Sequence, residues 1–411
     1  MINNLPNNFL QTSIWSKFWL EANNQNHKIH ILEINSDWQI KLLKTTILSN
    51  SLMQECDSQG VETSAKDEKT CPNKTILIYQ YPWKFNQIWL YIPRFGVNLK
   101  PTSKIDAHQL FQKIIKEVIG IGKIENATLI KLDFDSHFYN LLTFEEVPSL
   151  QLSSKLEIDR DEELDNPVNN KAWAIGDLHD SAGKLTLISN QKIVYSPRKI
   201  NFLSTIVLDV SYISSQDFAD NSKPSLEELQ LSVVQNSQFW NTTNQNVRRY
   251  TKKSFEQNWK VEVISNSFED WYGVYQATVK RQSFATHSKE YLQKLYNQEF
   301  AQSIILRDEF GIPQTAWMGG IFGNTLIYLH GGNTEESLKK YGQYLIHLVA
   351  INIASKNNCT NYDLGGWEEG KGFSKFKEGY HGKIVNYPGN FDVVLKQPDY
   401  FLTKSILQLK R

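Results

Sequence analysis

Alternating apolar and polar side chains predict strands in the first half of the chain. Between residues 28 and 50, Ile29, Ile31, Ile40 and Leu42 alternate with polar neighbours, a period typical of a hairpin of half-buried strands. The same reasoning gives further expected elements: strands over 75–81, 88–92 and 127–134, and an amphipathic helix over 107–119. The first half therefore combines strands with a helix.

The second half has a similar pattern of apolar runs. The expected elements are strands over 205–210, 301–307, 315–321, 325–330 and 361–364, and helices over 226–239, 268–281 and 341–356. Periodicity thus predicts two α/β halves with mixed sheets.

The length of the chain favours two domains. At 411 residues it exceeds the size at which one hydrophobic core keeps growing. We expect a first domain over 1–200 and a second over 201–411, with the extreme C-terminal segment as a candidate to pack back on the first. Two polar stretches, near 54–73 and 136–190, have few apolar positions and are predicted to be solvated insertions.

Composition narrows the function classes. The chain has 44 basic and 44 acidic residues, so its overall charge does not favour nonspecific binding to nucleic acid, although a local basic cleft is compatible with it. Cys56, Cys71 and Cys359 show no metal-ligand spacing, so we expect reduced thiols and no metal site. The N-terminus lacks the pattern of a signal peptide, and no window approaches ~18 apolar residues. A cytoplasmic protein is the expectation.

A glycine-rich segment near the C-terminus is the strongest candidate for a site. The run Tyr362-Asp363-Leu364-Gly365-Gly366-Trp367 follows the predicted helix, and Phe373-Ser374-Lys375-Phe376-Lys377-Glu378-Gly379-Tyr380 comes next. Two adjacent glycines carry no Cβ atoms, so a substrate can approach the backbone closely. The segment then presents a lysine, Lys377, beside an aromatic residue.

Four separated segments, in this order, resemble the Fem-type aminoacyltransferases. They are 9–17 (FLQTSIWSK), 91–97 (YIPRFGV), 205–211 with 244–249 (TIVLDVS and NQNVRR), and 328–333 (YLHGGN) with the glycine-rich segment just described. Each motif alone is weak, but together they span nearly the whole chain.

The resemblance implies a fold and an activity. The fold would be two tandem GNAT-like (N-acetyltransferase-type) domains. Residues 254–296 have no long heptad run, so the chain is similar to the FemX-like members that lack a helical arm. The activity would be transfer of an amino acid from aminoacyl-tRNA to the stem-peptide amine of a peptidoglycan precursor, UDP-MurNAc-pentapeptide or lipid II, to build the interpeptide bridge. Aminoacyl-tRNA would be a co-substrate, with no other cofactor, no DNA, and peripheral contact with the inner membrane face.

Transfer between an ester and an amine needs a positive charge near the oxyanion and no protein nucleophile. No Gly-x-Ser-x-Gly motif occurs. By the resemblance, Lys377 is the catalytic candidate, and Phe376 would stack on the terminal adenine of the tRNA. Composition alone favours a surface lysine after a buried phenylalanine at this position, and the resemblance reverses that preference.

Basic side chains are also expected at the diphosphate of the precursor. By the resemblance these are Lys17, Arg248 and Arg249, and ammonium and guanidinium groups suit phosphate. Lys17 on a solvated helix face is the alternative. The chain departs from the family where Asn244 replaces an arginine, which removes one phosphate contact.

Further site residues follow from the same comparison. Asp363 is either a general base or a cap of the glycine turn, and Tyr328 lines the substrate channel or belongs to the core. The other candidates for substrate binding are Gly331, Gly365 and Gly366, followed by Arg94, Arg281 and His287.

Two other functions remain open. An acyl-CoA-dependent N-acyltransferase would share the fold, but the segment 331–342 lacks the Arg/Gln-x-x-Gly-x-Gly/Ala spacing at a helix start and carries two acids. A non-enzymatic relative that binds precursor or tRNA is the other alternative.

Overall fold

A computed structural model describes residues 9–23, 27–35, 39–46, 74–97, 99, 101, 103–142, 192–196, 200–213, 223–230, 237–263 and 266–408. These residues form two compact units. The Lys377 unit contains the described residues up to 23 and those of 201–387, and the Lys131 unit contains those of 27–46, 74–200 and 388–408. The first helix, expected with the first domain, therefore packs with the second half of the chain.

The Lys377 unit is built on a seven-stranded mixed sheet in the order β13-β7-β12-β11-β10-β9-β8. Its strands are β7 (Ser204–Asp209), β8 (Lys260–Val263), β9 (Ala301–Arg307), β10 (Pro313–Phe322), β11 (Thr325–Asn333), β12 (Asn361–Gly366) and β13 (Lys383–Asn386). Only the β11–β12 pair is parallel.

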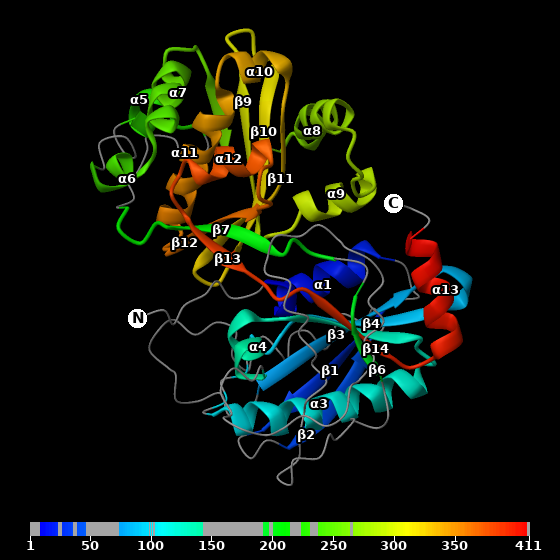
Figure 1. Ribbon diagram of the computed structural model, residues 1–411. Helices are drawn as coiled ribbons and strands as arrows, with labels where there is room; N and C mark the ends of the chain where they lie inside the picture. Colours follow the sequence, from blue (N-terminus) through cyan, green and yellow to red (C-terminus); the bar gives the residue numbers. More distant parts are fainter. Residues whose placement is uncertain are drawn as a thin grey trace. The chain divides into compact units, whose positions relative to one another are not determined.

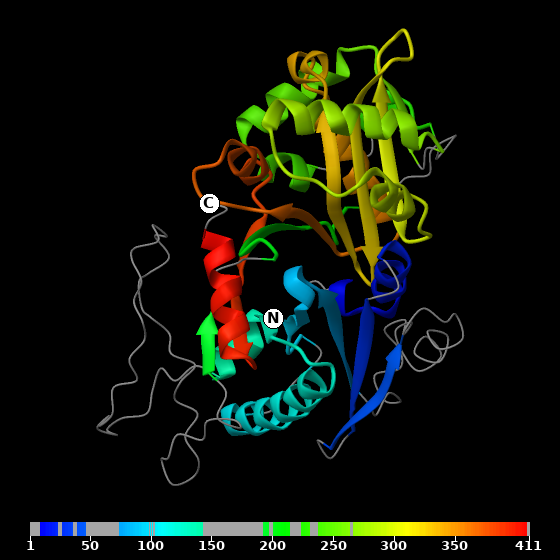
Figure 2. The ribbon, with the colours of Figure 1, turned by 90° about the vertical axis from the view of Figure 1, so that its right-hand side faces the viewer.

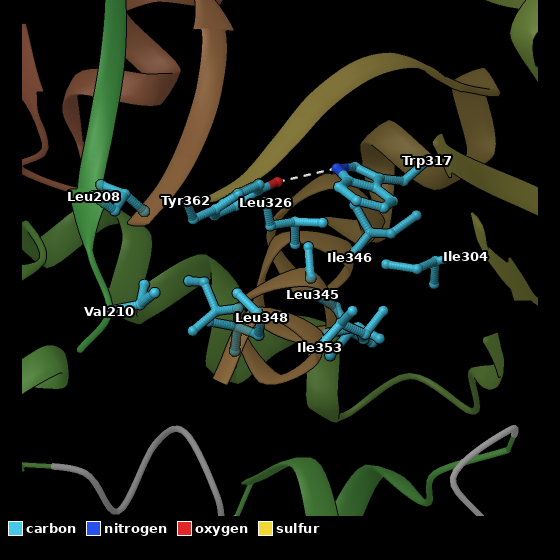
Figure 3. Packing of buried hydrophobic residues seen from close by; sticks show 14 of the residues in the cluster. Leu208, Val210, Ile304, Trp317, Leu326, Leu345, Ile346, Leu348, Ile353 and Tyr362 are labelled. Carbon is cyan, nitrogen blue, oxygen red and sulfur yellow. Dashed lines mark hydrogen bonds between the residues drawn. The ribbon is translucent and has the colours of Figure 1, made fainter. Parts of the chain in front are cut away.

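Helices cover both faces of this sheet (Figures 1 and 2). The described helices of this unit are α1 (Ser13–Ala22) after the 3-10 turn η1 (Phe9–Gln11), α5 (Leu226–Leu229), α6 (Ser237–Thr242), α7 (Gln245–Phe255), α8 (Phe268–Gln282), α9 (Lys289–Tyr296), α10 (Glu335–Lys339), α11 (Gly342–Lys356) and α12 (Gly372–Glu378). Helix α11 is buried along nearly its whole length because its central run is apolar all round. Figure 3 shows Leu345, Ile346 and Leu348 of α11 packed beneath Trp317 and Tyr362 of the sheet.

The Lys131 unit has a second seven-stranded mixed sheet, in the order β2-β1-β3-β4-β5-β14-β6. Its strands are β1 (Lys28–Ile34), β2 (Ile40–Thr46), β3 (Lys74–Pro82), β4 (Ile88–Phe95), β5 (Leu129–Phe134), β6 (Lys192–Tyr195) and β14 (Asn390–Val394). The apolar face of α3 (Lys104–Ile124) packs on one side of the sheet, and the unit also contains the 3-10 turn η2 (Lys84–Asn86), α4 (Ser136–Leu142) and α13 (Gln397–Gln408).

The predicted fold class is confirmed, since both units are α/β with mixed sheets. The hairpin expected over 28–50 is present as β1 and β2. One expectation was wrong in part, because residues 136–142 of the predicted insertion form helix α4. The insertion near 54–73 and the remainder up to 190 lie outside the described residues. Strands β6, β8, β13 and β14 were not predicted, since each has only four or five residues.

Candidate active site at Lys377

A tight turn at the end of β12, around Gly365, forms the centre of the site. The parallel pairing of β11 with β12 ends at Ile327 and Asp363. The Asp363 carboxylate then accepts hydrogen bonds from the Gly365 backbone N–H, at 2.8 Å, and from the Thr205 hydroxyl. Gly365 has a φ of +74°, and a Cβ there would lie 3.1 Å from the Tyr328 carbonyl oxygen. Glycine is therefore required where the chain turns beside β11. Asp363 acts as the cap of this turn.

Helix α12 inserts the Lys377 side chain behind this turn. Its Nζ donates a hydrogen bond to the Gly366 carbonyl oxygen at 2.7 Å. The ammonium also lies 5.3 Å from the ring centroid of Phe373 and 5.9 Å from that of Tyr328. The residue is 9% exposed, and no carboxylate among the described residues forms a salt bridge with it. Lys377 is thus a nearly buried cation without a paired anion.

Burial changes the protonation of Lys377. Removal from water lowers its pKa to about 8, and the nearby Asp363 carboxylate opposes this by favouring the charged form. The ammonium therefore predominates at neutral pH, but it loses its proton more easily than an ordinary lysine. Such a group can stabilise a developing negative charge in a site with little water.

Tyr328 and Gly331 of β11 lie next to each other, and the Tyr328 ring is close to the Lys377 ammonium. The Tyr328 ring is stacked on Trp317, with centroids 5.9 Å apart and an interplanar angle of 10°. A Cβ on Gly331 would lie 2.5 Å from the Tyr328 hydroxyl, so only glycine leaves room for the phenol. Burial raises the pKa of Tyr328, which therefore stays protonated. Among the described residues, no side chain forms a hydrogen bond with its hydroxyl.

A buried histidine, His347 of α11, supports the aromatic wall of the site. The Trp317 Nε1–H donates to the Tyr362 hydroxyl at 3.0 Å, and that hydroxyl lies 2.7 Å from His347 Nδ1 (Figure 3 shows the first bond). The Tyr362 hydroxyl thus bridges Trp317 of β10 and His347 of α11. Burial and the Lys377 charge lower the pKa of His347 to about 3. The sequence analysis missed this residue because a single histidine in an apolar helix gives no signal.

Phe376 faces the protein core. Its ring lies 5.0 Å from Tyr344, 5.4 Å from His347 and 5.6 Å from Tyr380, measured between centroids. Three aromatic neighbours already surround the ring. The role of Phe376 as a platform for adenine stays a prediction, whereas its packing of α12 onto α11 is observed.

Helix α7 begins against the end of α12. The Asn244 side chain caps α7 by accepting from the Val247 N–H at 2.9 Å, and the Asn244 N–H donates to the Gly379 carbonyl at 2.8 Å. The departure from the family arginine thus supplies a helix cap. The Arg248 guanidinium donates to the Trp240, Asn241 and Thr243 carbonyls at the end of α6. Arg248 therefore has a structural role whether or not it contacts phosphate.

The remaining predicted residues are more dispersed. Arg249 is exposed and packs on Tyr250, with its Cζ 4.6 Å from the ring centroid. Lys17 is exposed on α1, which packs against α9. Arg281 donates to the Asn333 carbonyl at 2.8 Å and so ties α8 to β11, and His287 stacks on Tyr291 at 4.2 Å.

Arg94 belongs to the Lys131 unit. Its backbone has a φ of +47°, and its guanidinium forms an ion pair with Asp133 at 3.1 Å. Of the predicted residues, the structure brings together Lys377, Tyr328, Gly331, Asp363, Gly365 and Gly366. Helix α7 contacts this group through the hydrogen bond between Asn244 and Gly379 at the end of α12.

In the described part of the chain, no group of three or more His, Cys, Asp or Glu side chains could hold a metal ion. Cys359 is a buried free thiol, and burial raises its pKa to about 11. Within the same residues, no helix has the length and apolar character needed to cross a membrane.

The part of the chain that contains this site matches a known protein family. A model of the FemAB family matches residues 297–407. Aminoacyltransferase FemA of Staphylococcus epidermidis is 25% identical over 139 residues, which cover 31% of this chain and 33% of FemA. The chain thus matches about a third of the length of the curated relative.

A crystal structure of FemX shows the fold over nearly the whole chain. That structure has a TM-score of 0.58 and 13% identity, and the match covers 97% of this chain and 95% of FemX. A tandem GNAT protein from the clavulanic acid biosynthesis pathway has a TM-score of 0.38 and 7% identity, over 79% of this chain and 80% of that protein. The resemblance is confirmed for residues 297–407, which match the FemAB family model and contain the Lys377 site, and the likeness to FemX shows the fold.

Proposed function

We propose that this protein is a cytoplasmic aminoacyltransferase that moves an amino acid from aminoacyl-tRNA to the stem-peptide amine of a peptidoglycan precursor. The observation that carries the proposal is Lys377, a nearly buried ammonium without an ion-pair partner among the described residues, beside a glycine turn in the family segment. The name of FemA, an aminoacyltransferase, supports the reaction class.

The reaction forms one amide bond and breaks one ester bond. The acceptor amine attacks the ester carbonyl carbon, and the carbonyl oxygen becomes an oxyanion. Lys377 would stabilise that oxyanion, because a fixed ammonium with little surrounding water interacts strongly with a developing charge. The intermediate then expels the ribose hydroxyl of the tRNA, which takes up the proton that the amine loses. No covalent enzyme intermediate is needed.

Neighbouring groups would position the substrates. The absence of a Cβ at Gly365 would let the ester approach the Lys377 ammonium, and the Tyr328 ring lies beside the same ammonium with a hydroxyl that can form a hydrogen bond. At Gly366 the Phe202 ring occupies the place that a Cβ would take. Lys17 and Arg249 are exposed cations suited to substrate phosphates. Asp363 would act indirectly, because it holds the turn in place.

The alternative donor, acyl-CoA, is disfavoured by the helix that follows β11. Glu335 and Glu336 occupy the first turn of α10. Acidic side chains at a helix N-terminus repel the pyrophosphate that this position holds in acyl-CoA enzymes. A thermal shift on addition of acetyl-CoA would revive this alternative.

The test is a transfer assay with total tRNA charged with labelled amino acids, and with UDP-MurNAc-pentapeptide or lipid II as acceptor. Lys377→Ala should lower kcat about a hundredfold or more, as loss of an oxyanion donor does in other enzymes. Lys375→Ala is the matched control, since Lys375 is an exposed lysine of the same helix. Labelled precursor with the parent and the control, but not with Lys377→Ala, supports the proposal. Absence of transfer with every donor and acceptor contradicts it.

A further inference from the structure

The Lys131 unit gathers exposed apolar side chains at one end of its sheet. Strands β4 and β5 run parallel from Trp89 and Leu129, and antiparallel β14 ends opposite Leu129 at Val394. The turn before β4, the loop before β5 and the start of α13 therefore meet at the same sheet end. The Thr128 N–H donates to Ile88 at 2.8 Å, and the Leu395 N–H donates to Thr128 at 3.0 Å.

Helix α13 is fixed to the turn before β4 (Figure 1). The Gln87 side chain donates to the Asp399 carbonyl at 3.0 Å and accepts from the Thr403 hydroxyl at 2.6 Å. Tyr400 and Thr403 are buried, whereas Phe401 and Leu402 between them are 72% and 43% exposed. The outer flank of α13 is thus apolar next to this turn.

Two more apolar side chains are exposed at this sheet end. Phe85 in the turn is 71% exposed, and Ile124 at the end of α3 is 80% exposed. We call Phe85, Ile124, Phe401 and Leu402 the sheet-end patch. Isolated exposed apolar residues are common, but four on adjoining segments indicate a binding surface.

Phe85 is held in an unfavourable backbone conformation. Its φ is +58° and its ψ +39°, in the left-handed region that bulky residues avoid. Asn86 shares this conformation, and asparagine suits it. A phenylalanine with a strained backbone and an exposed ring does not help the unit to fold. Strain of this kind is found where a residue is kept for function.

The charges around the patch are mainly positive. Lys84 and Lys123 are exposed next to Phe85 and Ile124, and Lys396 bonds to the Asn126 carbonyl at 2.9 Å. Two acids lie in the same segments: Glu125 is neutralised by Lys28 at 2.6 Å, and Asp399 lies in the first turn of α13, so three lysines face one acid without an ion pair among the described residues. Aromatic and aliphatic side chains flanked by lysines are typical of surfaces that lie in the interface of an anionic bilayer.

We propose that the sheet-end patch docks this protein on the surface of an anionic phospholipid bilayer, with Phe85 and Phe401 inserted among the lipid headgroups. Docking of this kind holds the chain where a lipid-linked substrate would be found. It requires no substrate and no transfer activity, so it can be tested separately from the proposed reaction.

The experiment is co-sedimentation of the full chain with vesicles of phosphatidylglycerol and phosphatidylcholine, and with vesicles of phosphatidylcholine alone. The parent should sediment with the anionic vesicles, and less so at high salt, because screening weakens the lysine contribution. Phe85→Asn should lower the partition coefficient about tenfold, since one large apolar side chain is lost from the interface. Phe401→Gln should act similarly.

Thermal stability separates binding from folding. Phe85→Asn should unfold at the same temperature as the parent or higher, because asparagine tolerates the left-handed region. Phe310→Asn is the matched control: Phe310 is 81% exposed in the Lys377 unit, in a turn with Asp308 and Glu309, and this change should not affect sedimentation.

Three outcomes would overturn the inference. In the first, the parent stays in solution with every vesicle, as expected if the patch binds a protein instead. In the second, the Phe85→Asn variant sediments like the parent. In the third, the Phe85→Asn variant has a clearly lower melting temperature than the parent.

Discussion

Each of the two units buries a lysine, but only one of the two lysines forms an ion pair among the described residues. Lys131 on β5 is 1% exposed, forms an ion pair with Asp392 of β14, and donates to the Ser196 hydroxyl. Lys377 on α12 is 9% exposed, donates to one backbone carbonyl, and faces two aromatic rings.

The difference separates a structural charge from an available one. A buried ammonium costs stability unless a carboxylate and further hydrogen bonds compensate it. In the Lys131 unit, Asp392 supplies the compensation and is itself bonded by Tyr400 at 3.1 Å. In the Lys377 unit one backbone carbonyl accepts from the ammonium and no carboxylate of the described residues forms a salt bridge with it, so the compensation is incomplete, and burial lowers its pKa. An oxyanion of a bound substrate would complete the compensation.

The largest effect is expected where the compensated pair is broken. Lys131→Met leaves the Asp392 carboxylate buried without its partner, and we expect a loss of about 3–5 kcal/mol in the free energy of unfolding. Chemical denaturation measures it. Adding Asp392→Asn to Lys131→Met should recover part of the loss, and a single variant as stable as the parent would show that the pair is not compensating a charge.

Removal of Lys377, whose charge is only partly compensated, should instead raise the free energy of unfolding. The folded pKa of Lys377, about 8, lies below its value of 10.5 in water, so below pH 8 the folded protein bears the full cost of burying the charge. Lys377→Met should gain on the order of 2 kcal/mol at pH 7. The gain should disappear between pH 8 and 10.5, because the parent becomes more stable as Lys377 loses its proton. Denaturation of both proteins across this range checks it.

Two neighbouring arginines of α7 also differ in whether their charge is bonded within the protein. Arg248 is bonded to the carbonyls that end α6, whereas Arg249 is exposed on the same helix. Arg248→Ala should lower the free energy of unfolding by about 1–2 kcal/mol, since those acceptors lose a charged donor. Arg249→Ala should change it by less than about 0.5 kcal/mol. Equal effects of the two changes would contradict the structural role of Arg248.

The smallest effect on stability is expected at Lys17. Its side chain is exposed, and no hydrogen bond or ion pair of the described residues involves it. Lys17→Ala should leave the melting temperature almost unchanged. A rise of KM for the precursor with unchanged stability would identify a phosphate contact, and unchanged kinetics would leave Lys17 as part of a solvated helix face.

Local patterns predicted the elements of the Lys377 site better than its chemistry. Apolar periodicity gave α11 and β12, and the glycine pair marked the turn, because these depend on neighbours in the chain. The burial of Lys377, the Asn244 cap and the Trp317–Tyr362–His347 hydrogen bonds depend on contacts between distant segments. Lys131 illustrates the limit: it lies in a strand that was predicted, but its partner Asp392 is 261 residues away.

The central claim is that Lys377 is kept at a cost in stability for its chemistry. The most direct measurement determines the free energy of unfolding and the rate of aminoacyl transfer on the same Lys377→Met protein at pH 7, beside Lys375→Met. We predict that Lys377→Met is at least as stable as the parent and has lost transfer, while Lys375→Met keeps both. A Lys377→Met protein that is clearly less stable, or one that transfers at the parental rate, would contradict the claim.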